Sequence, residues 1–349
     1  MSTRTAHIGR RATRGILASL AAFLLAATVS GLALQTAGAG TTQAGYPWPV
    51  KPFNRPHPIR GSFGDPRTLF HAPPTEAGLM TGSGSFSFHW GVDISAPNGT
   101  KVYPVVSGVV THVGHDQVAV DSSDGRVFEY WHIRPQVGIG DRVDAGETNL
   151  GRILRPFEHV HFAELQNGRL VNPLQVGHLT PYDDTTVPEV GPIRLRRADT
   201  GRDLMPTFVR GRVLLIAEAY DSLQIPLRGI WHDLPVAPAL ITWELKRWDG
   251  RVVVSQGVAT DFRQSLPSNR LFWSYYARGT YQNMAVFYPH YNWGQPGCFL
   301  FKLTRTAFDT RSVKDGVYDL VVTATDIRGN HDSKSLRLTI YNRSGWVGS

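Results

Sequence analysis

The residue types and spacings that can carry chemistry lie in two short stretches of the chain. The first holds His89 and Asp93, four residues apart, and the second holds His159 and His161, two residues apart. These are the ligand types of a catalytic zinc ion, which takes three protein ligands and keeps its fourth position for water. Histidines are scattered along the chain, but this pairing within strand-like contexts points to a metal centre.

The elements that must position these residues are predicted to be strands. Residues 159–164 alternate in character, which predicts a strand with His159 and His161 on one face. In a straight strand, His89 and Asp93 would start roughly 13 Å apart, at about 3.3 Å per residue. Ligands of one ion need a bend between them, and Gly91 can supply it.

The segment from residue 101 to residue 151 is rich in β-formers and predicts one antiparallel sheet with mostly local pairing. Residues 117–121 and 126–132 predict a hairpin joined by a Ser-Ser-Asp-Gly turn. His112 and His115 follow a strand in this segment without an acidic or histidine partner motif, so we expect them to be exposed to solvent.

A zinc hydrolase also needs a group that takes and returns the proton of the bound water. Glu164 is expected on the strand face opposite His161, and Glu129 on the face opposite His132, so neither carboxylate is well aimed. His132 and His159 are therefore the candidates. Their two roles, proton acceptor and donor to the oxyanion, are not assigned by the sequence.

Five separate motifs, found in the family's order between about Phe53 and Pro173, resemble those of the lysostaphin/LytM-type zinc endopeptidases. They are the His-x-Gly-x-Asp signature in Phe88–Gly99, the Ser-x-Phe-Gly-x-Arg entry in Arg60–Arg67, Tyr-x-His at Tyr130–His132, a Gly-x-x-Val-x-x-Gly turn at Gly140–Glu147, and His-x-His-Phe at His159–Phe162.

The resemblance implies a zinc site made by His89, Asp93 and His161, with His132 and His159 as the catalytic pair. It also implies peptide cross-bridges or stems of peptidoglycan as the substrate. One departure concerns a Tyr that some members carry ahead of the first His, where it helps to stabilise the oxyanion. This chain has no Tyr between residues 47 and 102.

Phe86 and Phe88 occupy the stretch where that Tyr is expected, so the sequence does not identify an oxyanion donor. The Gly/Ser/Pro-rich stretch 68–88 before the first ligand predicts a long loop. Such a loop can form a groove wall or be a surface insertion.

Residues 1–39 predict a signal peptide, since an Arg-rich start precedes a small and apolar run and an Ala-Gly-Ala site. The run spans 15–34 and is also long enough for an uncleaved membrane anchor. Without this segment's four Arg, the net charge falls from +8 to +4, which suits an anionic cell wall without demanding nucleic acid. The single Cys298 excludes an internal disulfide.

The remaining chain predicts a mostly β protein of two domains. Residues 40–181 would be the antiparallel-sheet peptidase domain with a Pro-rich lead, and 182–191 a linker. Residues 192–349 would be a β-sandwich that resembles immunoglobulin-like domains. In it, Gly211–Asp221 and Gly316–Asp326 predict two strands of one sandwich, and 335–340 predicts a final alternating strand. Aromatic clusters at 273–276 and 288–293 fit either glycan stacking or a sandwich core.

The sequence thus predicts a secreted or cell-wall-associated zinc endopeptidase with one zinc per chain. Its partner would be a peptidoglycan peptide, with no nucleic acid and no membrane span after cleavage, and the protein would be a monomer. The alternative is an inactive peptidoglycan-binding module or an activator of another cell-wall hydrolase. A biotinyl- or lipoyl-type carrier is disfavoured, because no Lys for attachment occurs between Lys101 and Lys246.

Overall fold

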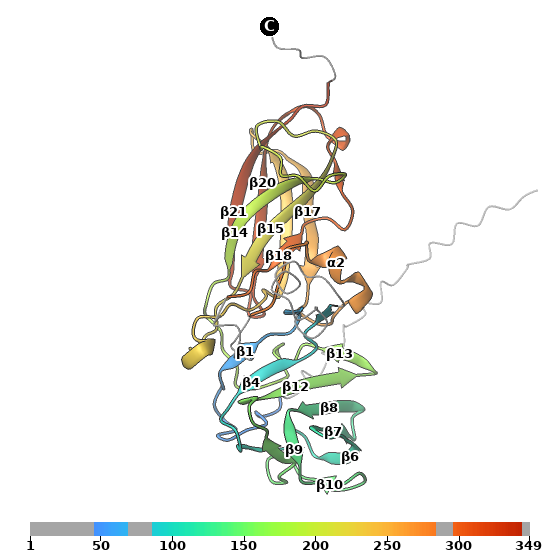
Figure 1. The fold of residues 1–349 in the computed structure, drawn as a ribbon, viewed down its shortest axis with the longest axis vertical. Helices are drawn as coiled ribbons and strands as arrows, with labels where there is room; N and C mark the ends of the chain where they lie inside the picture. Colours follow the sequence, from blue (N-terminus) through green and yellow to red (C-terminus); the bar gives the residue numbers. More distant parts are fainter. Residues whose placement is uncertain (1–44, 69–85, 284–295, 344–349) are drawn as a thin grey trace, which may run out of the picture. The chain divides into compact units, whose positions relative to one another are not determined.

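The computed structural model describes residues 45–68, 86–283 and 296–343. These residues form antiparallel sheets joined by turns, with only very short helices, which confirms the predicted mostly β fold class (Figure 1). No helix in these ranges is long and apolar enough to cross a membrane. The predicted signal peptide, the stretch 69–85 and the aromatic cluster 288–293 lie outside the described residues.

The N-terminal half is built on an eight-stranded sheet. Its order is β1-β4-β12-β8-β7-β6-β10, and β13 pairs with β12. The strands are β1 (Ile59–Gly61), β4 (Val92–Ser95), β6 (Gly108–Val113), β7 (Gln117–Ser122), β8 (Arg126–Trp131), β10 (Arg142–Val143), β12 (His159–Gln166) and β13 (Arg169–Val171). Beside it lie β5 (Lys101–Val102), β11 (Gly151–Ile153) and β9 (Ile133–Pro135) in one sheet, and β2 (Pro66–Arg67) with β3 (Ser87–Phe88) in another.

Alternation along these strands builds the first core. Val160 and Phe162 of β12 point into it, so His159 and His161, which alternate with them, point to the other face. The Pro-rich lead contributes to this core, because Tyr46 and Trp48 are almost fully buried in it. The predicted hairpin is confirmed as β7 and β8, closed by a turn in which Gly125 has a positive φ.

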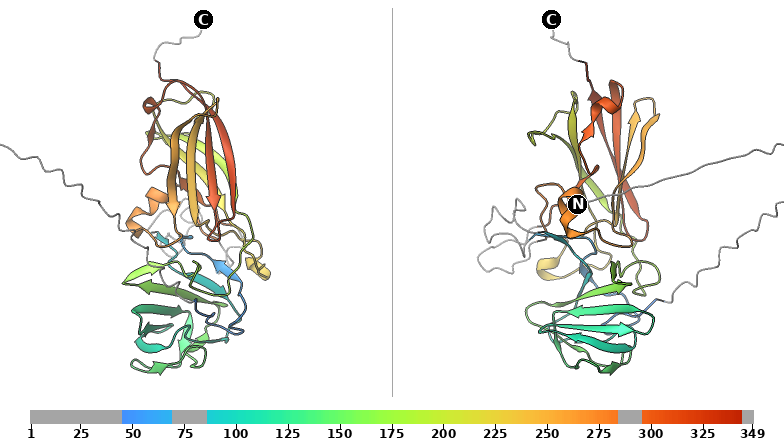
Figure 2. Two further views of the ribbon diagram at one scale, coloured as in Figure 1. Left: turned by 180° about the vertical axis from the view of Figure 1, so that it is seen from behind. Right: turned by 90° about the vertical axis from the view of Figure 1, so that its right-hand side faces the viewer.

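Two further antiparallel sheets form the C-terminal half, and they face each other around one core (Figure 2). One contains β14 (Glu189–Arg197), β15 (Arg212–Tyr220), β18 (Leu300–Lys302) and β19 (Phe308–Asp309). The other has β16 (Leu240–Arg247), β17 (Val252–Asp261), β20 (Gly316–Thr325) and β21 (His331–Ile340). The short helices are η1 (Gly229–Trp231), η2 (Asn269–Leu271), α2 (Phe272–Tyr275) and η3 (Thr310–Ser312).

The two similar segments singled out in the sequence contain strands β15 and β20, and each strand belongs to a different sheet of the sandwich. The final alternating strand is confirmed within β21. Of the first aromatic cluster, Tyr276 is fully buried and Trp273 packs against the core, which favours the core explanation.

Phe63, Phe86 and Phe88 come from the N-terminal half but belong to the core of the C-terminal sandwich. Phe86 stacks on Phe272 with ring centroids 5.4 Å apart. Hydrogen bonds cross at the same place, since the Tyr276 hydroxyl donates to the Gly64 carbonyl at 2.7 Å. The two halves therefore share buried surface, although the sequence places a domain boundary at 182–191.

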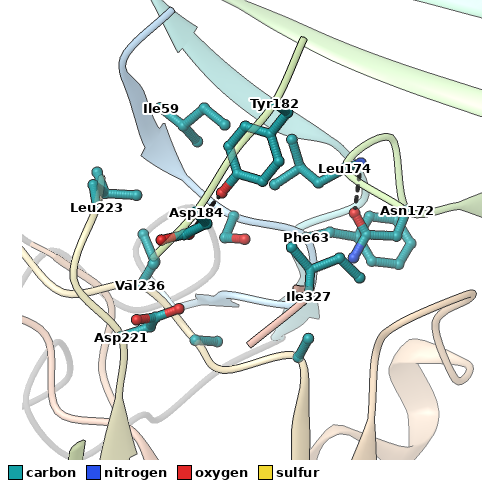
Figure 3. A pocket seen from close by; sticks show the side chains of 13 residues that line it. Ile59, Phe63, Asn172, Leu174, Tyr182, Asp184, Asp221, Leu223, Val236 and Ile327 are labelled. Carbon is teal, nitrogen blue, oxygen red and sulfur yellow. Dashed lines mark hydrogen bonds between the residues drawn. The ribbon is translucent and has the colours of Figure 1, made fainter. Parts of the chain in front are cut away.

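A small cavity of about 20 Å³ lies next to that boundary, too small for an organic ligand (Figure 3). Asp184 and Asp221 line it, and together with Asp326 they form a buried acidic group. The Tyr182 hydroxyl donates to Asp184, and three backbone N–H groups of residues 328–330 donate to Asp326. These carboxylates hold turns in place, and we assign no ligand to them.

Candidate metal centre

Three atoms from the two chemistry-bearing stretches converge on one point. His89 Nε2 lies 2.8 Å from His161 Nδ1 and 3.0 Å from Asp93 Oδ1, and the last two atoms are 3.1 Å apart. Neighbouring ligands of a tetrahedral zinc ion, with bonds of about 2.0–2.1 Å, are about 3.3 Å apart. The predicted trio therefore comes together in an arrangement that can hold a metal ion.

Hydrogen-bonding partners orient two of the three candidate ligands, His89 and Asp93. His89 Nδ1 lies 2.8 Å from the Ser62 carbonyl, which accepts its proton and leaves the Nε2 lone pair free for a metal. Arg67 Nη2 donates to Asp93 Oδ2 at 2.9 Å, which leaves Oδ1 as the oxygen that could bind a metal ion. This donor set fits zinc, the metal that the residue types predict.

The electrostatics favour the protonation states that metal ligation needs. Burial, and then the Arg67 charge, lower the pKa of His89 to about 3, so its imidazole is neutral at pH 7. Burial acts to raise the pKa of Asp93, but His89 and His159 outweigh it and hold that pKa well below its usual range. His89 is therefore a neutral imidazole and Asp93 a carboxylate.

Gly91 provides the bend that brings His89 and Asp93 together. It lies between β3 and β4, and β4 begins only at the next residue. A methyl group added at Gly91 would lie 2.3 Å from the Phe162 carbonyl oxygen and 2.9 Å from His161 Nε2. The bend therefore requires glycine because the backbone of β12 passes directly beside it.

His132 and His159 lie next to the trio, as predicted. Their ring centroids are 4.7 Å apart, and the His132 ring is 6.4 Å from that of His161. His159 Nε2 approaches Asp93 Oδ1 to 3.4 Å. Burial lowers the pKa of both histidines, to about 3 for His132, where the neighbouring His159 adds to the effect.

The other predictions about nearby polar residues are also resolved. Glu164 is fully buried on the far side of β12, where it accepts hydrogen bonds from Tyr46 and His178. Glu129 accepts a hydrogen bond from the Trp131 indole at 3.0 Å. His112 and His115 are exposed, as expected.

Sequence reasoning missed three residues around His132 and His159. The Arg60 guanidinium contacts His159 Nδ1, and its other face packs on the Trp231 ring at 4.1 Å. Asp116 Oδ2 lies 3.6 Å from His132 Nδ1. Arg60 stands inside a recognised motif, but nothing in the sequence links Trp231, from η1, to a site 70 residues earlier.

The fold and the donor set define a β protein with a His-Asp-His group that could hold a metal ion. The sequence of residues 87–173 matches the model of peptidase family M23. This match confirms the resemblance for the part of the chain that carries the site. No protein of curated function matches the sequence.

Several solved structures resemble the chain. A variant catalytic domain of the prophage-encoded M23 protein EnpA from Enterococcus faecalis is 24% identical and covers 39% of this chain and 98% of its own, with a TM-score of 0.27. The lysostaphin catalytic domain from Staphylococcus simulans is 22% identical and covers 32% and 86%, with a TM-score of 0.24. A zinc-containing peptidase from Vibrio cholerae is 22% identical and covers 37% and 39%, with a TM-score of 0.29.

Proposed function

We propose that this chain is a zinc-dependent endopeptidase that hydrolyses peptide bonds of peptidoglycan. The observation that carries the proposal is the convergence of His89, Asp93 and His161 within about 3 Å, with two more histidines beside them. The family match over residues 87–173 supports the peptidase class. The predicted signal peptide supports a site of action outside the cell.

The residues divide the work of hydrolysis between them. His89, Asp93 and His161 would hold one zinc ion, which when bound supplies Lewis acidity and a water of lowered pKa. His132 and His159 are not needed as ligands, since three protein ligands complete a catalytic site. Both neighbour the trio, and in this proposal they would handle the proton of the water and the charge that develops on the peptide oxygen.

The alternative function is a module that binds peptidoglycan without cutting it. Loss of a ligand or of a catalytic histidine would favour that function, and this chain retains all five residues. We also propose that residues 40–181 form the peptidase domain, and that 192–349 form an immunoglobulin-like sandwich joined to it through 182–191.

The test is incubation of the zinc-loaded full chain with defined peptidoglycan, followed by mass analysis of the products. We expect new amino and carboxyl termini at one type of peptide bond. The His161→Ala variant should release none. Binding to the wall with no cleavage product, by a chain that holds zinc, would support the alternative instead.

A further inference from the structure

The first candidate metal ligand, His89, is hydrogen-bonded at three points to one short turn, residues 62–65. The His89 N–H donates to the Asp65 carbonyl at 2.8 Å, and the His89 carbonyl accepts the Gly64 N–H at 2.9 Å. The ring atom Nδ1 of His89 lies 2.8 Å from the Ser62 carbonyl. The position of this turn therefore sets the position of His89.

The C-terminal half holds this turn with two buried hydrogen bonds. The Ala237 N–H donates to Asp65 Oδ1 at 2.7 Å, and the Tyr276 hydroxyl donates to the Gly64 carbonyl at 2.7 Å. Asp65 is only 2% exposed, and its other oxygen, Oδ2, accepts the Ser62 N–H at 2.9 Å. The Asp65 carboxylate thus joins the backbone of the C-terminal half to the residue whose carbonyl orients the first ligand.

The residue before His89 is anchored in the same half. The Phe88 ring belongs to the core of the sandwich, where its centroid lies 5.5 Å from that of Phe262. The Phe88 N–H donates to Asn269 Oδ1 at 3.1 Å. Glycine at position 64 lets the turn approach this core, because a methyl group added there would lie 2.2 Å from the Phe262 ring. Both the turn and the residue before the first ligand therefore rest on the C-terminal half.

We propose that the C-terminal half is part of the metal centre, because it positions His89 through Asp65, Tyr276 and Phe88. The inference rests on the zinc site of the proposed function. The three are positioning residues, since they act through the ligand rather than on the ion or the substrate. Loss of an outer hydrogen-bond partner lowers metal affinity by about 10- to 100-fold. Loosening the turn should therefore weaken zinc binding although every ligand is still present.

This assignment gives the C-terminal half a role that a separate binding module would not have. Two aromatic side chains next to the metal centre, Phe63 of the turn and Phe88, are buried in the core of the sandwich. Both would be exposed to water if the two halves came apart, which disfavours separation. The contact between the halves and the affinity for zinc should therefore be coupled.

Two conservative variants of the full chain test this coupling. Tyr276→Phe removes only the hydroxyl that reaches the Gly64 carbonyl, and it changes no charge. Asp65→Asn keeps the shape of the side chain but has one acceptor oxygen, so its NH2 group meets one of the two N–H donors. We expect each variant to raise the zinc Kd about tenfold, measured by competition with a chelator well below Tm, where the chain is folded.

The matched control is the same substitution within the sandwich, Tyr318→Phe. Tyr318 is buried in the same core as Tyr276, but its hydroxyl donates to the Lys314 carbonyl, within the C-terminal half. A second control, Arg328→Met, removes donors to the Leu174 and Tyr182 carbonyls, which lie outside the turn. Both controls should lower Tm and change the zinc Kd less than about twofold, since sites without shared partners act independently.

A zinc Kd of Tyr276→Phe within about twofold of the wild type would overturn the proposal. A loss of affinity confined to Asp65→Asn would overturn it too, because the Asp65 carboxylate also lies 3.7 Å from Arg67 Nη1 and its charge would then be the cause. An equal loss in Tyr318→Phe would show that affinity follows stability and not the position of the turn.

Zinc affinity is measured whether or not the chain cuts peptide, so this test and the test of the proposed function fail separately. A wild type that binds zinc tightly but releases no product would refute the endopeptidase function, and the variants would still report the coupling. A wild type that cuts peptide, with variants that bind zinc as it does, would refute only the role of the C-terminal half.

Discussion

Replacing Glu164 with Ala should cost stability and leave catalysis intact. Its side chain is fully buried and accepts hydrogen bonds from Tyr46 and from His178 at 2.6 Å, with Arg126 at 3.7 Å. Removing one partner of a buried charged network costs about 3–5 kcal/mol. At about 2.1 cal/mol/K of unfolding entropy per residue, the 270 described residues give a Tm shift of about 1.8 °C per kcal/mol, so we expect a fall of about 5–9 °C.

The assay is thermal unfolding of the zinc-loaded chain, with zinc content and kcat measured well below Tm. Both should stay within about twofold of the wild type, because Glu164 points away from the metal centre. The matched control is Glu147→Ala, an exposed site that should change stability by less than about 0.5 kcal/mol. An unchanged Tm together with a 100-fold loss of kcat would refute this reasoning and make Glu164 a catalytic group.

Three further predictions concern the site and the acidic group. His132→Ala and His159→Ala should each keep zinc content near normal and cut turnover by about 100- to 10,000-fold; loss of zinc would make either one a ligand. Gly91→Ala should abolish tight metal binding, because the added methyl group would meet the Phe162 carbonyl. Zinc titration, with Gly138→Ala as the control, measures this. Normal zinc affinity of Gly91→Ala would contradict the need for a glycine at the bend. Burial, and then the charge of Asp184, raise the pKa of Asp221 to about 8. Between the ordinary pKa of an Asp side chain and pH 8, Asp221 therefore keeps its proton in the folded state and loses it in the unfolded chain. The free energy of unfolding therefore falls as pH rises toward 8, by up to about 1.4 kcal/mol per pH unit. Tm of the wild type should fall relative to that of Asp221→Asn between pH 5 and 9. Parallel curves of Tm against pH for the two proteins would contradict the raised pKa.

The metal trio could be predicted because its signals are local. Alternation places His159 and His161 on one face of a strand, and a glycine between His89 and Asp93 permits the bend. The same alternation of side chains along a strand excludes Glu164 as the group that takes the proton of the water. The structure places Glu164 in a buried hydrogen-bond network behind the sheet.

Long-range packing could not be predicted in the same way. The sequence places Phe86 and Phe88 in a loop before His89, yet they are buried in the core of the other half. The contact of Trp231 with Arg60 joins residues 171 positions apart, and no periodic pattern encodes it. Such contacts follow from how two halves meet, which single-sequence patterns do not describe.

The central claim is that one zinc ion, held by His89, Asp93 and His161, carries the hydrolysis of peptide bonds. Its most direct test is metal content by mass spectrometry together with turnover of peptidoglycan peptides, before and after chelation and zinc restoration. We expect about one zinc per chain, activity lost and regained with the metal, and neither zinc nor activity in His161→Ala. Full activity after complete removal of metal would contradict the account.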